Sequence, residues 1–373
     1  MRTKLILRTS LMLTLTACDG GGELINDFGH AASKDYIPGI SVAAGNLEEG
    51  VVWARGYGYA DIENGVPMNA DTKLRIASIS KVFATAGLAR LMDEGKIDLD
   101  APVQTYAPSF PDKGAPITLR TLTGHQSGAR GYKAEEFLLN TPFNSVEQGL
   151  AIWKDDPLAY TPRTEVKYST HAWTLISAAM EGASGESFLP FMQAQVFAPL
   201  GMTSTVPDYQ TPLIKNRARP YVHDDSLNLI NAPQVDLSYK WAGGGFLSTT
   251  SDVVTFALAH LDDQLISDST RDELFTAQNL ADGEETGFGI GWMVGWTNQM
   301  INIEGRVPEG KEDAAMEIMS KHPDAVMHSG GAVGGNSMML LCKTHKHASA
   351  VSINVSDAQG YALWLALRTL ATY

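Results

Sequence analysis

Positive charge is scarce in this sequence: 28 lysine and arginine residues stand against 42 aspartate and glutamate residues, giving a formal net charge of −14. A protein whose main partner is nucleic acid or an anionic lipid surface presents an excess of basic side chains. The composition therefore argues against both partners. The acidic residues are scattered along the chain, and their simplest role is to keep a soluble surface from aggregating.

Cysteine is scarcer still, with only Cys18 and Cys342. A disulfide between them would tie the extreme N-terminus to a late apolar strand, and we do not expect it. Beyond the N-terminal leader, no stretch has the length of a transmembrane helix, and no repeat or long low-complexity run is visible. What remains is a globular chain of 373 residues, 44% hydrophobic, which suits two compact domains or one large two-part domain.

The first 17 residues have the pattern of a secretion signal. Arg2, Lys4 and Arg8 precede a short apolar stretch that runs into Leu15-Thr16-Ala17-Cys18. Small residues directly before a cysteine resemble a bacterial lipobox. We expect cleavage before Cys18, lipidation of Cys18, and a lipid anchor that holds the chain on the extracytoplasmic, periplasmic side of a bacterial membrane. The alternative is an ordinary signal peptide with an incidental cysteine.

Strand patterns occupy both ends of the remaining chain and helical patterns its middle. Residues 18–34 are predicted to be a flexible tether, and residues 35–373 a single α+β domain. Its α/β part is predicted at about 35–95 and 226–373, and an inserted, mainly helical part at about 96–225. The expected strands are 37–45, 51–59, 287–294, 325–328, 337–342 and 348–355, and the clearest helices are 78–94, 173–182, 249–261 and 362–373. We expect the early and late strands to form one antiparallel sheet flanked by helices.

Ser78-Ile79-Ser80-Lys81 opens an apolar helix, which places Ser78 and Lys81 on one helical face. Free backbone N–H groups and the helix dipole favour developing negative charge there. A serine hydroxyl becomes an effective nucleophile when a neighbouring base takes its proton, and a desolvated lysine with a lowered pKa can be that base. The alternative is that Ser78 is only a helix N-cap.

Two later segments could complete a site around this serine. Tyr168-Ser169-Thr170 precedes a helix, and a phenol held near an ammonium as phenolate can act as a general base. His328-Ser329-Gly330-Gly331 ends an apolar strand, where small residues let a substrate lie along the strand edge. A backbone N–H there could pair with that of Ser78 as an oxyanion hole. The alternatives are a packed tyrosine at a helix entry and a glycine-rich turn with a buried histidine.

In this order, the three motifs resemble those of the serine beta-lactamase and penicillin-binding superfamily, in its class C-like branch: Ser-x-x-Lys, Tyr-x-Asn, and Lys-Thr-Gly or a variant. Segments that also resemble the family are 56–61, 75–77, 122–128 and 242–249. The strings Arg-Ile-Ala-Ser-Ile-Ser-Lys and Tyr-Ser-Thr are similar in particular to the mitochondrial serine beta-lactamase-like proteins. The resemblance spans about residues 35 to 365.

The resemblance implies a beta-lactamase/transpeptidase-like fold without a cofactor or metal. It implies that Ser78 is the acylated nucleophile, that Lys81 shuttles its proton and that Tyr168 is the general base. The N–H groups of Ser78 and Gly331 would form the oxyanion hole. The implied substrate-binding and oxyanion residues are His328, Ser329, Gly330, Gly331 and Thr170.

Two positions depart from the family pattern. Thr170 stands where the family has an asparagine that helps to hold the substrate amide. His328 stands where the family has a lysine whose ammonium meets a substrate carboxylate, and a mostly neutral imidazole binds carboxylate less well at pH 7. Both departures favour the esterase and peptidase branches over an efficient beta-lactamase.

The other histidines receive structural roles. His345 and His347 alternate on one strand face and could ligate a metal, but no third ligand is evident from the sequence, so we expect them to be solvent-exposed. His125 is expected to support a loop.

The sequence thus predicts a serine hydrolase that acts through a Ser78 acyl-enzyme on a small ester, amide or peptide. One alternative is a true class C-like beta-lactamase or a D-specific peptidase. Another is a non-catalytic scaffold or assembly protein that keeps the fold. The partners expected are a small-molecule or peptide substrate and the lipid anchor, with no nucleic acid. The oligomeric state stays open.

The leader motif gives the first testable prediction. A palmitate analogue fed to bacterial cells should label the wild-type chain and should not label Cys18→Ala, because the thiol of Cys18 is the expected acylation site. Equal labelling of both chains would contradict the lipoprotein assignment.

Overall fold

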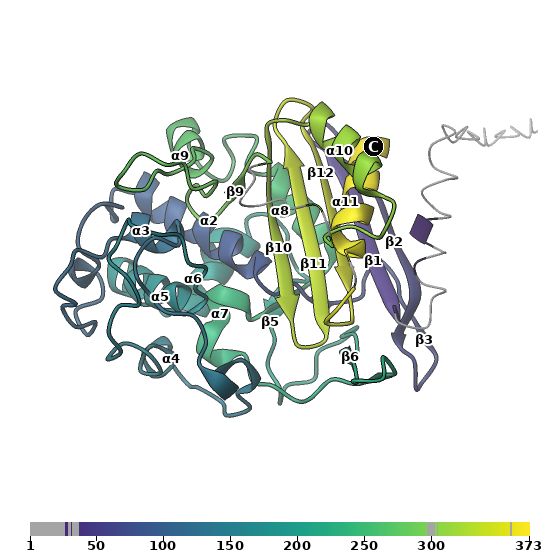
Figure 1. Ribbon diagram of the computed structural model, residues 1–373, viewed down its shortest axis with the longest axis horizontal. Coiled ribbons are helices and arrows are strands. Elements are labelled where there is room, and N and C mark those ends of the chain that lie inside the picture. The colour runs from purple at the N-terminus through teal and green to yellow at the C-terminus, as the bar shows by residue number, and fades with distance from the viewer. Residues whose placement is uncertain (1–26, 29–30, 32–36, 297–302, 304, 359) are drawn as a thin grey trace, which may run out of the picture.

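The computed structural model describes residues 27–28, 31, 37–296, 303, 305–358 and 360–373 (Figure 1). Cys18 and the leader lie outside the described residues. None of the helices in the described part of the chain combines the length and apolar character needed to cross a membrane.

The fold is built on a seven-stranded antiparallel sheet with the strand order β3-β2-β1-β12-β11-β10-β9. Its strands are β1 (Gly39–Asn46), β2 (Gly50–Asp61), β3 (Val66–Pro67), β9 (Met293–Val294), β10 (Ala325–Ala332), β11 (Gly335–Cys342) and β12 (His347–Ile353). The first strand pairs with the last one along its whole length, from Ile40 opposite Ile353 to Asn46 opposite His347. Early and late strands therefore form one sheet, as predicted, and Figure 1 shows them side by side.

Helices cover both faces of this sheet, so β1 is buried over nearly its whole length and reads as a continuous apolar run. On one face lie α10 (Glu312–Lys321) and α11 (Tyr361–Thr372), with α11 packed on β11 and β12. On the other face lies α8 (Thr250–Leu258), packed on β1 and β12. The side chains of Ile40 and Val42 enter one core and that of Ala43 enters the other, as the period of two requires.

The second layer is mainly helical and surrounds α2 (Ile79–Asp93), which is buried around almost its whole circumference. The other helices of this layer are α3 (Leu119–Thr123), α4 (Val146–Leu150), α5 (His171–Ser184), α6 (Phe188–Met192), α7 (Trp241–Gly244) and α9 (Asp268–Leu274). Short 3₁₀ turns cover Val103–Thr105, Ala134–Leu138 and Ser238–Lys240, and a π-helical turn covers Gln193–Phe197. Helices α7 and α9 come from the segment that the sequence analysis placed in the α/β part, and they pack with this layer.

Small sheets link the layers. β4 (Leu74–Arg75) and β5 (Val206–Pro207) flank β8 (Phe246–Ser248), and β6 (Tyr221–His223) pairs with β7 (Leu229–Asn231). One strand prediction was too long: of residues 287–294, only β9 is a strand. Gly287 and Gly291 have φ values of +71° and +76°, a left-handed backbone that interrupts a β-ladder.

A buried ion pair fixes the segment that leads into Ser78. The Arg75 guanidinium donates to Asp208 Oδ2 at 2.7 Å and to the Val333 carbonyl at 2.5 Å, and Arg217 also pairs with Asp208. The Asp208 side chain is fully buried. Arg75 thus ties β4, which leads into the serine motif, to the turn that follows β10, the strand that carries the glycine motif.

We predict that Asp208→Asn lowers the free energy of unfolding by about 3 kcal/mol, because it leaves a mostly buried guanidinium without its counter-charge. Urea unfolding followed by circular dichroism would measure this loss. Glu317→Gln is the matched control, because it breaks an exposed pair with Lys321 and should cause no measurable change. Equal stability of Asp208→Asn and the wild type would rule out the tethering role of this pair.

Candidate active site

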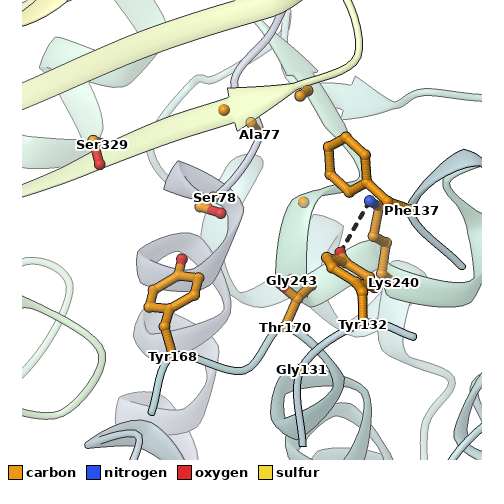
Figure 2. A pocket seen from close by; sticks show the side chains of 13 residues that line it. Ala77, Ser78, Gly131, Tyr132, Phe137, Tyr168, Thr170, Lys240, Gly243 and Ser329 are labelled. Carbon is orange, nitrogen blue, oxygen red and sulfur yellow. Dashed lines mark hydrogen bonds between the residues drawn. The ribbon is translucent and has the colours of Figure 1, made fainter. Parts of the chain in front are cut away.

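A cavity of about 340 Å³ opens where the end of the sheet meets the helical layer. It brings together five of the predicted site residues, Ser78, Tyr168, Thr170, Ser329 and Gly331 (Figure 2). The rest of its lining is Ala77, Gly131, Tyr132, Phe137, Lys240, Gly243, Gly244 and Ala332. Segments that are far apart in the sequence therefore form one pocket around the predicted nucleophile.

Ser78 lies at the N-terminus of α2, but its side chain forms no capping hydrogen bond. Its hydroxyl instead lies 2.9 Å from the Lys81 amine, one helical turn further on. This geometry favours the nucleophile over the alternative of a simple N-cap.

The backbone before Ser78 is strained and tightly packed. Ala77 has φ +49°, a conformation that L-residues rarely adopt and that is often found at functional sites. Strand β10 packs directly against this segment: a Cβ on Gly330 would lie 2.3 Å from the Ile76 carbonyl oxygen, and Ser337 donates a 2.8 Å hydrogen bond to the same oxygen. Glycine at position 330 therefore brings β10 close to the nucleophile.

The Lys81 amine is fully buried and has three polar neighbours. Gly243 O lies at 2.6 Å, Ser78 Oγ at 2.9 Å and Thr170 Oγ1 at 3.3 Å from Nζ. Burial, and then the positive charge of Lys240, lower the pKa of Lys81 well below its ordinary value. A neutral amine has two N–H groups for Gly243 and Thr170 and one lone pair for the Ser78 hydroxyl proton. The arrangement suits a general base.

Tyr168 stands on the segment before α5, with its ring centroid 4.8 Å from the Lys81 amine. Tyr168 is 43% exposed and lines the cavity. Burial raises the pKa of Tyr168, and an interaction with the Ser78 side chain opposes only part of that rise. Burial thus favours the phenol form of Tyr168 over the expected phenolate, and a phenol in this position can donate a proton.

His328 and Gly330 differ from the expectation that they contact substrate. Side chains alternate along a strand, so Ser329 and Gly331 line the cavity while His328 and Gly330 face the interior. The His328 ring is fully buried, and its Nδ1 donates to the Ser329 carbonyl at 2.6 Å. Burial lowers the pKa of His328 to about 3. His328 therefore replaces the family lysine without supplying its charge.

The two proposed oxyanion donors have suitable positions. Ser78 is at a helix N-terminus and Gly331 is on β10, and both line the cavity. Within the described residues, β9 pairs with β10 only at Val326 and Met327, so the edge of β10 beyond them is free to meet a substrate.

One prominent residue of the cavity, Lys240, was not predicted from the sequence. Its amine lies 3.1 Å from the Tyr132 hydroxyl and 4.7–5.0 Å from the ring centroids of Tyr132, Phe137 and Tyr239. Lys240 is nearly buried, yet among the described residues no carboxylate lies within ion-pair distance of it. Its place among Tyr239 and Trp241, directly before the glycine-rich segment at 243–245, was the signal available in the sequence.

His125 supports a loop, as predicted. Its Nδ1 accepts a 3.2 Å hydrogen bond from the backbone N–H of Ser169, and its ring lies 4.3 Å from that of Tyr168. The Lys167 N–H donates to the His125 carbonyl. His125 thus positions the segment that carries Tyr168.

Residues 26–371 match the family model described as Beta-lactamase. The protein belongs to the beta-lactamase family. This match confirms the resemblance drawn from the motifs, and the fold described above is that of the family.

Several relatives show how this family member compares with others. The chain is 33% identical to the mouse mitochondrial serine beta-lactamase-like protein LACTB, over 86% of this chain and 73% of that one. It is 27% identical to a D-aminopeptidase of Gluconobacter oxydans, over 86% and 57% of the two chains. A solved structure of D-amino acid amidase from Ochrobactrum anthropi has the same fold, with a TM-score of 0.77 at 21% identity over 95% and 98% of the two chains.

The lowered pKa of Lys81 predicts how acylation of Ser78 depends on pH. The rate of labelling by a neutral fluorophosphonate ester should rise with pH as Lys81 loses its proton, with a midpoint well below the ordinary pKa of lysine. Lys240→Met removes the nearby positive charge, which raises the pKa of Lys81 and shifts this midpoint to higher pH. Stopped-flow or quenched labelling across pH would measure both midpoints.

Lys240→Arg is the control, because it keeps the charge and should keep the midpoint near that of the wild type. A midpoint that Lys240→Met leaves unchanged, or moves to lower pH, would contradict the electrostatic coupling between the two lysines.

Proposed function

We propose that this chain is an acyl-transfer hydrolase that cleaves a small ester, amide or peptide through an acyl-enzyme on Ser78. The observation that carries the proposal is the fully buried Lys81 amine, 2.9 Å from the Ser78 hydroxyl and favoured in its neutral form. Burying a lysine without a counter-charge lowers stability. A purely structural scaffold does not require such a residue.

In the proposed acylation of Ser78, each residue of the site has one role. Lys81 takes the hydroxyl proton of Ser78 while Oγ attacks the substrate carbonyl carbon. The oxyanion that forms is stabilised by the N–H groups of Ser78 and Gly331. Tyr168 gives its proton to the departing alcohol or amine and regains one from the Lys81 ammonium. Water then releases the acyl group by the same steps in reverse, and Ser78 recovers its proton.

The charges around the cavity bear on the choice of substrate. The buried, neutral His328 offers no cation to a carboxylate, which supports the preference for neutral esters and amides inferred from the sequence. Lys240, on another wall of the cavity, does offer a cation. Among the residues that the structure describes, no carboxylate forms an ion pair with it. This cation favours the second candidate function, a peptidase or beta-lactamase whose substrate carries a carboxylate. Relatives named as a D-aminopeptidase and a D-amino acid amidase support an amide or peptide bond as the target.

The proposed function is tested with the purified protein, a neutral p-nitrophenyl ester, a carboxylate-bearing peptide anilide and nitrocefin. The wild type should turn over at least one of these acyl compounds and gain one adduct in intact mass after fluorophosphonate treatment. Ser78→Ala should lose both the turnover and the adduct, because it removes the nucleophile. Lys81→Met should slow both by at least about a hundredfold, because it removes the base.

Lys240→Met separates the two substrate classes. If the carboxylate binds Lys240, this variant should lose about ten- to a hundredfold in kcat/KM for the carboxylate-bearing substrates relative to the ester. If the ratio of kcat/KM for the carboxylate-bearing substrates to kcat/KM for the ester is unchanged, Lys240 does not bind a substrate carboxylate. The result would then favour a hydrolase of neutral substrates. An adduct that persists in Ser78→Ala, or a wild type that neither reacts with fluorophosphonate nor hydrolyses any substrate, would refute the enzyme and favour the scaffold.

A further inference from the structure

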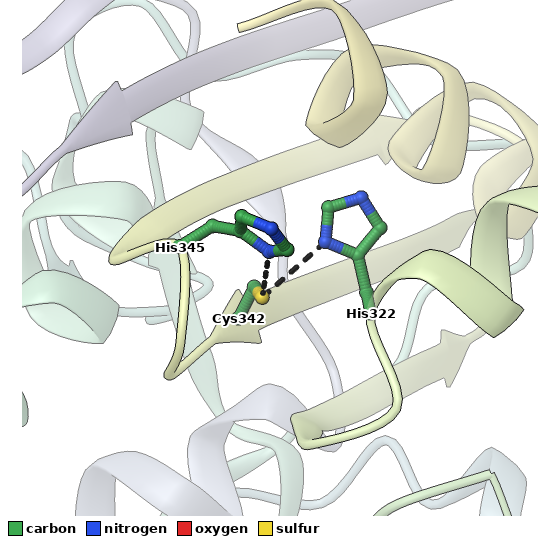
Figure 3. A group of neighbouring side chains, drawn as sticks. All are labelled: His322, Cys342 and His345. Carbon is green, nitrogen blue, oxygen red and sulfur yellow. Dashed lines mark hydrogen bonds between the residues drawn. The ribbon is translucent and has the colours of Figure 1, made fainter.

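Away from the active site, three metal-binding side chains converge at the other end of the β10–β11 hairpin (Figure 3). Cys342 is the last residue of β11, His322 directly follows α10, and His345 stands in the turn between β11 and β12. The Cys342 sulfur lies 3.3 Å from His322 Nδ1 and 3.1 Å from His345 Nδ1. All three potential ligand atoms lie within 4.8 Å of one another.

This grouping corrects the expectation from the sequence. His345 and His347 were considered as a pair that lacked a third ligand. In the structure His347 opens β12 outside the group, whereas His345 joins two residues that the sequence analysis did not connect with it. Cys342 is buried, His322 is nearly buried, and His345 is exposed, so the group lies just below the surface and is accessible from one side.

The contacts around the sulfur are unusual for an ordinary buried thiol. Besides the two imidazole nitrogens, Asp324 Oδ1 lies 3.5 Å from Sγ. A thiol has one proton and can donate to only one of these three atoms, and neutral sulfur is a weak acceptor for the others. A cation bound to a thiolate would engage the two imidazole lone pairs and the sulfur together.

We propose that Cys342, His322 and His345 form a binding site for a transition-metal ion of the Zn²⁺ type. One thiolate and two imidazoles are ligands that zinc prefers. In a tetrahedral site with the usual Zn–S and Zn–N bond lengths, sulfur and nitrogen are about 3.6 Å apart, so the two sulfur–nitrogen distances need to widen by only a few tenths of an ångström. Binding replaces the Cys342 thiol proton, which leaves to solvent, with a sulfur–metal bond.

The fourth ligand position falls to Asp324 or to water. The Asp324 Oδ2 atom accepts hydrogen bonds from the backbone N–H and the hydroxyl of Thr344, both at 2.7 Å, which leaves Oδ1 on the side of the sulfur. A carboxylate held in this way either binds the ion or orients the ligands around it.

The surrounding backbone already holds the ligands in place. The Trp296 indole donates a 2.7 Å hydrogen bond to the His322 carbonyl, and Cys342 pairs with Ala325 and His347 in the sheet. The cluster is not part of the catalytic cavity: Ser329 pairs with Met338, four residues before Cys342, which is about 13 Å along the strand. A bound ion would therefore tie the end of α10 to the β11–β12 turn as a structural cross-link.

The test uses the full chain freed of metal with a chelator, then supplied with Zn²⁺ or with Co²⁺ as a spectroscopic probe. We expect one Zn²⁺ per chain, a rise of a few degrees in thermal midpoint, and a thiolate-to-cobalt charge-transfer band with Co²⁺. Cys342→Ser should abolish the band, and His345→Ala should weaken Zn²⁺ binding at least tenfold. His345 is exposed, so its replacement leaves the core intact.

His223→Ala is the matched control, since it removes a histidine on β6, outside this cluster, and should bind Zn²⁺ like the wild type. Stoichiometry from elemental analysis and affinity from titration with a competing chelator complete the comparison. The proposal fails if the wild type shows no Zn²⁺-dependent shift and no cobalt–thiolate band, or if Cys342→Ser and His345→Ala bind as tightly as the wild type.

Discussion

The desolvation of one amine determines how the active site is built. Lys81 is placed one turn after Ser78 on a helix that is buried on almost all sides, and its hydrogen-bond partners within the described residues are Ser78, Thr170 and the carbonyl of Gly243. An ammonium there would lose its hydration, and no carboxylate in the described part of the chain pairs with it, so the buried position favours the neutral base. The surrounding elements hold this environment: α5 begins just after Thr170, and α7 supplies Gly243.

Glycine makes the close packing around that amine possible. A Cβ on Gly243 would lie 2.5 Å from the Thr170 methyl group, and one on Gly330 would collide with the Ile76 carbonyl. These two positions let α7 and β10 approach the helix that carries Ser78. Arg75 then links β4 to the β10–β11 turn, so the nucleophile and the oxyanion strand are held by the same buried guanidinium.

The sequence was most informative where function depends on local spacing. Ser78 and Lys81 could be placed because three residues make nearly one helical turn, and the strands at both ends of the chain could be recognised from alternation. Spacing alone does not tell which side of a strand faces the cavity, so His328 was expected to contact substrate and is buried instead. The His322–Cys342–His345 cluster could not be predicted from the sequence, because tertiary packing alone brings its three members together.

The pairing of β1 with β12 has a consequence for the order in which the molecule is made. Ile40 meets Ile353, and the two are separated by nearly the whole length of the chain. A ribosome has therefore finished the helical layer long before the central strand of the sheet finds its partner. Contacts of such high sequence separation close late in folding, so the nascent chain stays without a continuous sheet, and its β1–β2 hairpin keeps an open edge, until synthesis is almost complete. A chaperone that acts on the nascent chain would have that long interval in which to protect the open edge of β1.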